Sequence, residues 1–284
     1  MEGGPLPVRY APGCCAKLES VRHTTMEVPK EAKQILDILL DGIEGILQQN
    51  LVGVYPSGSI AVGDFKPDTS DIDIVAVTRE PVTNEEFSKL LAFHERIRGL
   101  ANPYSERIEM AYIYLDAFKR YEPGQSHPTL DLGESLSRVE HKTNWILDRR
   151  IIRERSVALN GPAPKDLIDP ISDDEVRSAV SRRLNDWLEW AKAIEDPDWN
   201  LGIRHKRYIV QTMCRSLRTM ATGEISTKSE SVEWALSALP EPYRSTVEES
   251  KAWEQGNPSD PQTLNEDLRR LIQWAATDDK SALS

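Results

Sequence analysis

Two aspartates separated by a single residue, Asp71 and Asp73, are the strongest candidates for chemistry in this 284-residue chain. They open the run 71–77, which turns continuously apolar after Asp73, as in a buried strand. Side chains two apart in a strand share a face, so the two carboxylates are expected side by side. Such a pair needs a neutralising cation, although a turn or a cap is the commoner explanation of an isolated Asp-x-Asp. Mg²⁺ suits the pair because it binds one or two carboxylates together with phosphates and water.

A glycine and a serine, Gly58 and Ser59, lie about a dozen residues before the aspartates. They follow an apolar run at 51–55, so we expect a strand that breaks into a loop and then a helix start. Glycine lets the backbone approach a phosphate closely, and serine adds a hydroxyl donor where a helix begins. This segment is therefore a candidate phosphate-binding loop.

Gly-Ser followed by Asp-x-Asp on a buried strand resembles the signature of the polymerase-beta-like nucleotidyltransferase fold. The resemblance implies a third carboxylate on a neighbouring strand, facing the pair. Glu109 is the natural candidate, because an acidic residue inside the apolar strand 108–114 needs a reason. The alternative is an edge strand on which Glu109 faces water.

The elements that would position these residues follow from hydrophobic periodicity. Helices are expected from Pro29 to about 47, at 83–99 and near 139–154, and a short extended segment at 157–162. The stretch from Phe118 to about Gly133 reads as an irregular loop. Beyond Asp173 apolar residues recur at helical spacing, and these stripes indicate a helical core.

The expected fold class is α+β: an N-terminal nucleotidyltransferase domain with a mixed sheet, followed by an all-α helical bundle. The corresponding boundaries are a tail at 1–25, the nucleotidyltransferase domain at 26–165 and the helical domain at 166–284.

The second half narrows the resemblance. The segments 153–162, 222–228 and 232–235, with Leu239-Pro240 and Tyr243, are similar to segments of the bacterial streptomycin/spectinomycin adenylyltransferases. The similarity spans roughly residues 50–255 in matching order. Members of that family join ATP to an antibiotic hydroxyl in the cleft between two domains, with Mg²⁺.

The resemblance implies a role for each matching position. Asp71 and Asp73 would bind Mg²⁺, with Glu109 as a further ligand and as the general base that accepts the hydroxyl proton. Ser59 and Ser70 would lie near the phosphates, together with Gly58. Lys228 would reach the triphosphate from the helical domain.

The acceptor side departs from the family pattern. The segment near 130–140, where the family carries a substrate-contacting tryptophan, is shorter here, and an ATP-contacting family aspartate corresponds approximately to Asn144. The streptomycin-selecting acid and histidine of the family would fall near His205 and Tyr208, so that pair is not reproduced here. Trp199 is expected either to supply an aromatic wall or to pack in the core. The acceptor is thus a spectinomycin- or streptomycin-like antibiotic or another polyol.

Composition limits the partners. The formal net charge is −11, with 46 acidic and 35 basic residues, which disfavours binding to nucleic-acid phosphates and suits a cationic acceptor. No apolar stretch is long enough to cross a bilayer, and the N-terminus lacks the features of a secretory signal. We therefore expect a cytoplasmic monomer. The three cysteines (Cys14, Cys15 and Cys214) predict neither a zinc site nor a disulfide framework.

The leading hypothesis is an ATP- and Mg²⁺-dependent adenylyltransferase that confers antibiotic resistance. One alternative keeps this chemistry but transfers AMP to another metabolite or to a protein side chain. The other is a non-catalytic nucleotide-binding, antitoxin-like module.

Overall fold

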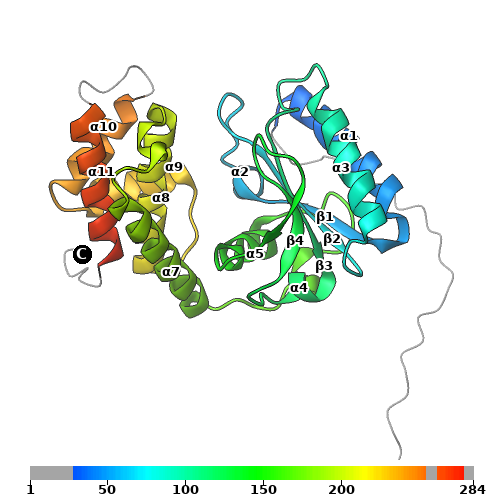
Figure 1. Cartoon of the computed structure of the whole chain (residues 1–284). Helices are drawn as coiled ribbons and strands as arrows, with labels where there is room; N and C mark the ends of the chain where they lie inside the picture. Colours follow the sequence, from blue (N-terminus) through cyan, green and yellow to red (C-terminus); the bar gives the residue numbers. More distant parts are fainter. Residues whose placement is uncertain (1–27, 254–260, 278–284) are drawn as a thin grey trace, which may run out of the picture.

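The computed structural model describes residues 28–253 and 261–277. Two parts stand side by side: a sheet with its helices, and a group of helices (Figure 1). The expected tail at 1–25, with Cys14 and Cys15, lies outside the described residues, whereas Cys214 is a buried free thiol.

Five strands form a single sheet in the order in which they occur along the chain. They are β1 (Leu51–Pro56), β2 (Ile72–Thr78), β3 (Ile108–Tyr114), β4 (Ser126–Leu130) and β5 (Ser137–Glu140). Strands β2 and β3 are parallel, and the other neighbours are antiparallel, so the sheet is mixed. The parallel pair carries Asp73 and Glu109, and Asp71 immediately precedes β2.

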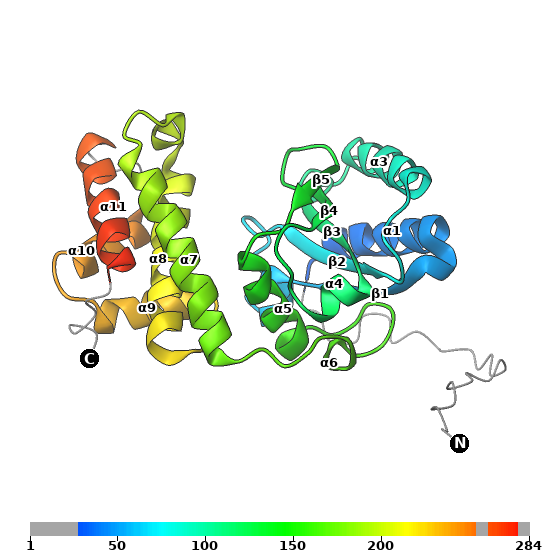
Figure 2. The ribbon, with the colours of Figure 1, turned by 60° about the horizontal axis from the view of Figure 1, so that its bottom comes forward.

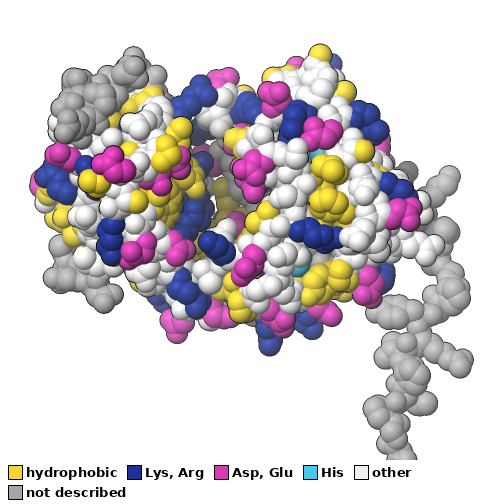
Figure 3. Space-filling model, in the orientation of Figure 1, with side chains coloured by type: hydrophobic (Ala, Val, Ile, Leu, Met, Phe, Trp, Pro, Cys, Tyr) yellow, Lys and Arg dark blue, Asp and Glu magenta, His cyan; other side chains and the backbone are white. Residues whose placement is uncertain are grey.

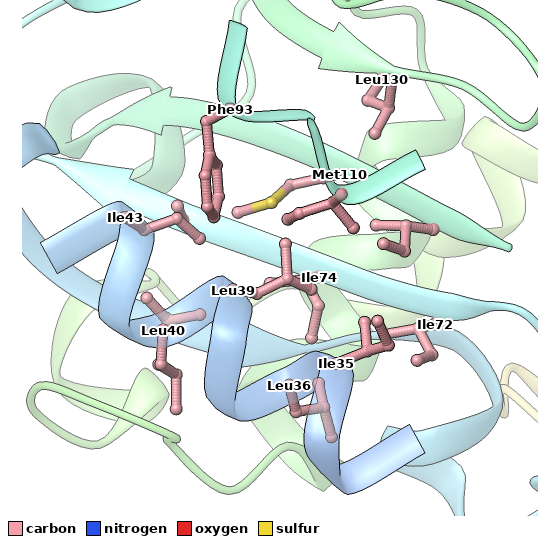
Figure 4. Packing of buried hydrophobic residues seen from close by; sticks show 14 of the residues in the cluster. Ile35, Leu36, Leu39, Leu40, Ile43, Ile72, Ile74, Phe93, Met110 and Leu130 are labelled. Atoms are coloured by element: carbon pink, nitrogen blue, oxygen red, sulfur yellow. The ribbon is translucent and has the colours of Figure 1, made fainter. Parts of the chain in front are cut away.

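Two helices, α1 (Lys30–Leu47) and α3 (Asn84–Arg98), cover one face of the sheet. The apolar stripe of α1, including Ile35 and Leu39, packs onto Ile74 and Met110 of the central strands (Figure 4). Pro29 precedes the first turn of α1, and a capping box of Thr83 and Glu86 begins α3.

The opposite face is covered by α4 (Leu115–Lys119) and α5 (Asn144–Arg155). Val75, Val77, Ala111 and Ile113 point to this side from β2 and β3. Asp73 and Glu109 have the same parity as these residues, so strand alternation directs them to the α5 face. Strand β1 is preceded by a short 3-10 turn, η1 (Gln48–Asn50), and followed by helix α2 (Gly58–Val62).

The helical part follows α6 (Pro164–Leu167) (Figures 1 and 2). It consists of α7 (Asp173–Lys192), η2 (Pro197–Asn200), α8 (Ile203–Thr222), α9 (Lys228–Ala238), α10 (Tyr243–Ala252) and α11 (Pro261–Ala276). Buried residues of all five α-helices form one core that includes Leu184, Met213, Ala235 and Leu268. None of the helices in the described part has the length and apolarity that spanning a bilayer requires.

The predicted fold class is confirmed, whereas two local predictions are wrong. The stretch expected to be an irregular loop contains β4 and the end of α4, and the helix expected from about 139 begins at Asn144 because β5 occupies Ser137–Glu140. Both missed strands are short and lie toward one edge of the sheet, where Pro128 and alternating polar residues are tolerated. A short strand with a proline and polar residues has the same sequence pattern as a loop.

Candidate active site

Parallel pairing of β2 with β3 assembles the predicted carboxylates. Asp73 and Glu109 are direct register partners, and Asp71 immediately precedes β2. All three are half-buried and lie where the two strands begin. The structure therefore brings together the three acids that the sequence singles out.

Burial and mutual repulsion make these acids unusually weak. Burial, reinforced by Asp71 and Asp148, raises the pKa of Asp73 to about 6. Burial and the neighbouring Asp73 raise the pKa of Glu109 to about 8, and the two carboxyls are hydrogen-bonded to each other. Two carboxyl groups that share a proton in this way form a place where a cation replaces that proton.

Gly58 allows the loop after β1 to pack against Asp73. Its φ is +48°, and a Cβ built there would lie 2.0 Å from Oδ2 of Asp73. The Ser57 amide also donates to the Asp73 carbonyl at 2.8 Å. Any larger residue at position 58 would displace the carboxylate, and the backbone angle itself disfavours an L side chain.

Ser59, the next residue, has an unused hydroxyl. Its Oγ is buried and has no hydrogen-bond partner among the described residues. Buried polar atoms are nearly always paired, so an orphan beside three carboxylates suits a ligand oxygen. Ser70 is engaged differently, since its Oγ accepts from the Lys66 amide at 2.9 Å and helps to fold the loop before Asp71.

Arg107 is a site residue that the sequence did not reveal. Its Nε lies 3.6 Å from Oδ1 of Asp71, and its guanidinium donates to the carbonyl oxygens of Pro67 and Ser70. Burial raises the pKa of Asp71, and the charge of Arg107 opposes that rise. Arg107 thus holds Asp71 in place from the residue just before β3.

The helical part contributes positive charge. Burial raises the pKa of both Asp71 and Asp73, and the charge of Lys228, the first residue of α9, opposes that rise. Its Nζ lies 5.8 Å from the centre of the Tyr208 ring. Arg215 on α8, which sequence reasoning missed, is near enough to Asp73 for its own pKa to be affected. In the sequence, the signal that could have indicated this residue is an arginine next to the apolar stripe of α8.

Asp148 on α5 is a further missed residue. Burial raises its pKa, and Arg183, Arg215 and Arg149 oppose the rise. It adds to the negative charge around Asp73. A carboxylate of α5 therefore faces the arginines of the helical part.

A separate pocket of about 370 Å³ opens next to this site. Its lining comes from the start of α5, from α7 and from the segment that leads into α8: Lys142, Thr143, Asn144, Arg183, Asp186, Trp187, Trp190, Asp198 and His205. The surface is hollowed between the two parts, with hydrophobic and basic side chains along the helical side (Figure 3). The structure thus places the predicted residues Asn144 and His205 in one pocket, and Nε2 of His205 is buried without a hydrogen-bond partner among the described residues.

Trp199 packs in the core and does not form a wall of this pocket. Its side chain is 3% exposed, its ring stacks on Trp190 at 4.1 Å, and its Nε1 donates to the Ala193 carbonyl at 3.1 Å. Of the two alternatives, the structure thus favours packing. Trp190 and Trp187 line the pocket instead. Trp187 lies in an apolar helical stripe, which is the pattern of a core residue.

The described residues include no group of three or more His, Cys, Asp or Glu side chains that is arranged to hold a metal ion by itself. This fits the ligand preference of Mg²⁺, which takes one or two carboxylates and completes its shell with phosphates and water. The acids at the start of β2 and β3 match that donor set.

Two family models match the chain. The model described as "Nucleotidyltransferase domain" covers residues 40–116, which include all three carboxylates. The model described as "Aminoglycoside adenylyltransferase, C-terminal domain" covers residues 166–277, which include Lys228.

Curated relatives match both parts. The chain is 26% identical over 259 residues to a spectinomycin 9-adenylyltransferase of Campylobacter jejuni, covering 87% of this chain and 94% of the relative. It is also 26% identical over 239 residues to an aminoglycoside (3'') (9) adenylyltransferase of Shigella flexneri, covering 79% and 84%.

A solved structure shares the fold. The spectinomycin adenyltransferase AAD(9) from Enterococcus faecialis, determined with ATP and spectinomycin, superposes with a TM-score of 0.67 at 17% identity over 86% of this chain and 99% of that one. Together with the three acids that meet where β2 and β3 begin, these matches support the aminoglycoside adenylyltransferase family for this chain, which is a nucleotidyltransferase.

Proposed function

We propose that this enzyme transfers AMP from ATP, with Mg²⁺, to a hydroxyl of a cationic aminoglycoside-type antibiotic of the spectinomycin or streptomycin kind, releasing pyrophosphate. The observation that carries the proposal is the meeting of Asp71, Asp73 and Glu109 on one face of the sheet, beside the Gly58 turn. Such transfer inactivates an antibiotic in the cytoplasm, so resistance is the expected outcome.

The nucleotide side is served by groups from both parts of the chain. The orphan hydroxyl of Ser59 offers a hydrogen bond to a phosphate oxygen. Lys228 and Arg215 bring positive charge toward the aspartates. Cationic groups aimed at a phosphoryl centre stabilise the charge that develops on it and on the leaving pyrophosphate.

Asp71, Asp73 and Glu109 would hold the Mg²⁺. A bound Mg²⁺ supplies charge neutralisation at the phosphates and lowers the pKa of nearby acids. The raised pKa values of Asp73 and Glu109 support the fit, because burial and the neighbouring carboxylates disfavour their charged forms and a bound cation would offset both effects.

Glu109 would accept the proton of the acceptor hydroxyl. The hydroxyl oxygen forms a bond to the α-phosphorus of ATP, and the bond from that phosphorus to the bridging oxygen breaks to release pyrophosphate. The proton moves to Oε of Glu109, because a hydroxyl is a poor nucleophile until a base within hydrogen-bond reach takes its proton. Asp71 is less suited as the base, since Arg107 and Lys228 favour its charged form, and Lys228 also favours the charged form of Asp73.

The pocket beside the acids suits a cationic acceptor. Trp187 and Trp190 offer aromatic faces, and the exposed Asp186 and Asp198 offer carboxylates at its mouth. Aromatic rings and carboxylates together bind ammonium and guanidinium groups. A volume of about 370 Å³ is within the range of small-molecule sites.

The test is a turnover assay with purified protein, ATP, Mg²⁺ and a panel that includes spectinomycin and streptomycin. We expect pyrophosphate release with at least one member, and a product heavier by one AMP in mass spectrometry. Absence of pyrophosphate with every antibiotic, alongside AMP-sized mass shifts on cellular metabolites or proteins, would instead support the other acceptor classes. ATP binding without any transfer would support the non-catalytic alternative.

A further inference from the structure

A hydrogen-bonded contact joins the two parts of the chain next to the active site. The Ser229 hydroxyl of α9 accepts a hydrogen bond from the Lys66 ammonium at 3.1 Å. It donates to the Asp64 carboxylate, whose two oxygens both lie 3.3 Å from the Ser229 Oγ. More than 160 residues separate Ser229 from either partner. We call this group of Asp64, Lys66 and Ser229 the interdomain clasp.

On the sheet side, the clasp is attached to the loop that leads to Asp71. Asp64 and Lys66 belong to segment 63–70, which connects Ser59 to Asp71. The Asp64 amide donates to the Ser59 carbonyl at 2.9 Å, and the Ser70 amide donates to the Lys66 carbonyl at 2.8 Å.

The segment just before β3 holds the same loop in place. Tyr104 donates through its hydroxyl to the Pro67 carbonyl at 3.1 Å, and Arg107 binds that carbonyl and the Asp71 carboxylate. A displacement of Ser229 is therefore resisted by groups that also fix Asp71.

On the helical side, the clasp is attached to Lys228. Ser229 and Lys228 are consecutive residues in the first turn of α9. This turn is held by a capping box, in which Thr227 accepts from the Glu230 amide at 3.0 Å and its own amide donates to Glu230 at 2.9 Å. The backbone of Lys228 consequently cannot shift without moving Ser229.

We propose that Ser229 is a positioning residue: through the clasp it fixes the start of α9 against segment 63–70 and so holds the Lys228 ammonium toward Asp71 and Asp73. The inference rests on the proposed nucleotidyl transfer for its kinetic consequences. Lys228 is an exposed, long side chain, so its reach is useful only if its backbone is fixed. The clasp supplies that fixation with a small hydroxyl that bridges two charged groups.

The test compares Ser229→Ala with Ser229→Thr, which keeps the hydroxyl. We expect Ser229→Ala to raise the KM for ATP about tenfold, as for one lost charge-assisted hydrogen bond. Ser229→Thr should return it to within about twofold of the wild type. In a Lys228→Met background, Ser229→Ala should add less than about twofold, because the residue acts through Lys228. Ser237→Ala is the matched control, since Ser237 is on the same helix and bonds only to the Trp234 carbonyl.

A second measurement needs no turnover. Hydrogen exchange should rise in Ser229→Ala at the amides of segments 63–70 and 227–231, and should not change in Ser237→Ala. An unchanged KM and unchanged exchange would overturn the clasp, as would an equal tenfold effect with and without Lys228. If the wild type transfers AMP to no acceptor, the proposed function fails, and hydrogen exchange alone decides the clasp.

Discussion

Glu109 is the residue whose environment says most about its role. A carboxyl beside another carboxyl is costly in a fold, yet strand register places Glu109 directly opposite Asp73. Replacing it by glutamine keeps the shape and the hydrogen bond but removes the base. We expect Glu109→Gln to lower kcat by about 10²–10⁴-fold, the usual contribution of general base catalysis.

The control for this variant is nucleotide affinity. If Glu109 acts as the base, calorimetric titration of Glu109→Gln with ATP should give a dissociation constant within about threefold of the wild type. Near-normal turnover would rule out the base role, and a complete loss of ATP binding would show that the variant had damaged the site rather than the proton transfer.

Gly58 offers a second test at the same scale. Gly58 and Gly63 both have positive φ (+48° and +74°), but a Cβ at Gly63 meets nothing within 4 Å, whereas one at Gly58 meets the Asp73 carboxylate. Each Ala variant should lose about 1 kcal/mol of unfolding free energy from the backbone angle. We expect Gly58→Ala alone to lose activity, by more than about a hundredfold. Equal activity losses in the two variants, measured beside urea unfolding, would show that the steric argument is wrong.

The sequence predicted those site residues that share a strand or a loop. Asp71 and Asp73 follow from spacing, because a strand puts alternate residues on one side. Arg107, Asp148 and Arg215 could not be found in this way, since each reaches the site only through the packing of a different element. Trp187 and Trp190 were hidden for a related reason: an aromatic stripe on a helix has the same pattern whether it faces a core or a pocket.

At the scale of elements, long periodic segments were predictable and short edge strands were not. The apolar stripe of α1 and the apolar run of β3 are strong enough to locate both elements from the order of apolar residues in the sequence. Strands β4 and β5 are each held by few neighbours and owe their existence to pairing with β3 and with each other. Pairing between strands that are distant along the chain leaves no pattern within either strand's own sequence.

Strands β4 and β5 also bring two histidines together. The rings of His127 and His141 lie 4.6 Å apart, and His141 stacks on Trp145 at the start of α5. Burial lowers the pKa of His127 to about 4 and that of His141 to about 3. Both are therefore neutral in the folded protein at pH values where the unfolded chain protonates them.

These histidines predict a loss of stability in mild acid. A histidine with a lowered pKa binds fewer protons when folded, so its contribution is complete above pH 6.5 and falls as the pH drops toward 4. Between pH 7 and pH 5 each costs roughly 2 kcal/mol. His127→Phe should reduce that loss by about this amount in urea unfolding at the two pH values. Tyr114→Phe, which changes a ring in contact with His127 but removes no imidazole, should retain the wild-type loss; equal losses in all three proteins would contradict the assignment.

At the scale of the whole molecule, the proposed function would divide chemistry and acceptor binding between the two parts. The carboxylates belong to the sheet, whereas the aromatic and acidic lining of the neighbouring pocket comes mostly from α7 and the segment before α8. Such a division lets the acceptor side change while the nucleotide side is kept. It is consistent with a sequence that matches the family at its motifs but departs from it around His205.

The overall charge of −11 gives this division an electrostatic consequence. Asp186 and Asp198 are exposed and line the pocket, so they would attract the proposed cationic acceptor. Replacing both by asparagine keeps the size of the side chains and removes two negative charges. We expect the KM for a cationic antibiotic to rise about tenfold while the KM for ATP stays within about twofold, because the nucleotide is bound by other residues.

The matched control is Asp174→Asn, which removes a charge from the same helix as Asp186, at a side chain 97% exposed and outside the pocket. Salt separates the two effects further. Raising the ionic strength from about 0.05 to 0.5 M should weaken antibiotic binding to the wild type and to Asp174→Asn, because exposed charges are screened. The double variant should respond less. An equal salt dependence in all three proteins would mean that the acceptor does not pass these carboxylates, and an equal rise in both KM values would mean that the pocket and the nucleotide site are one.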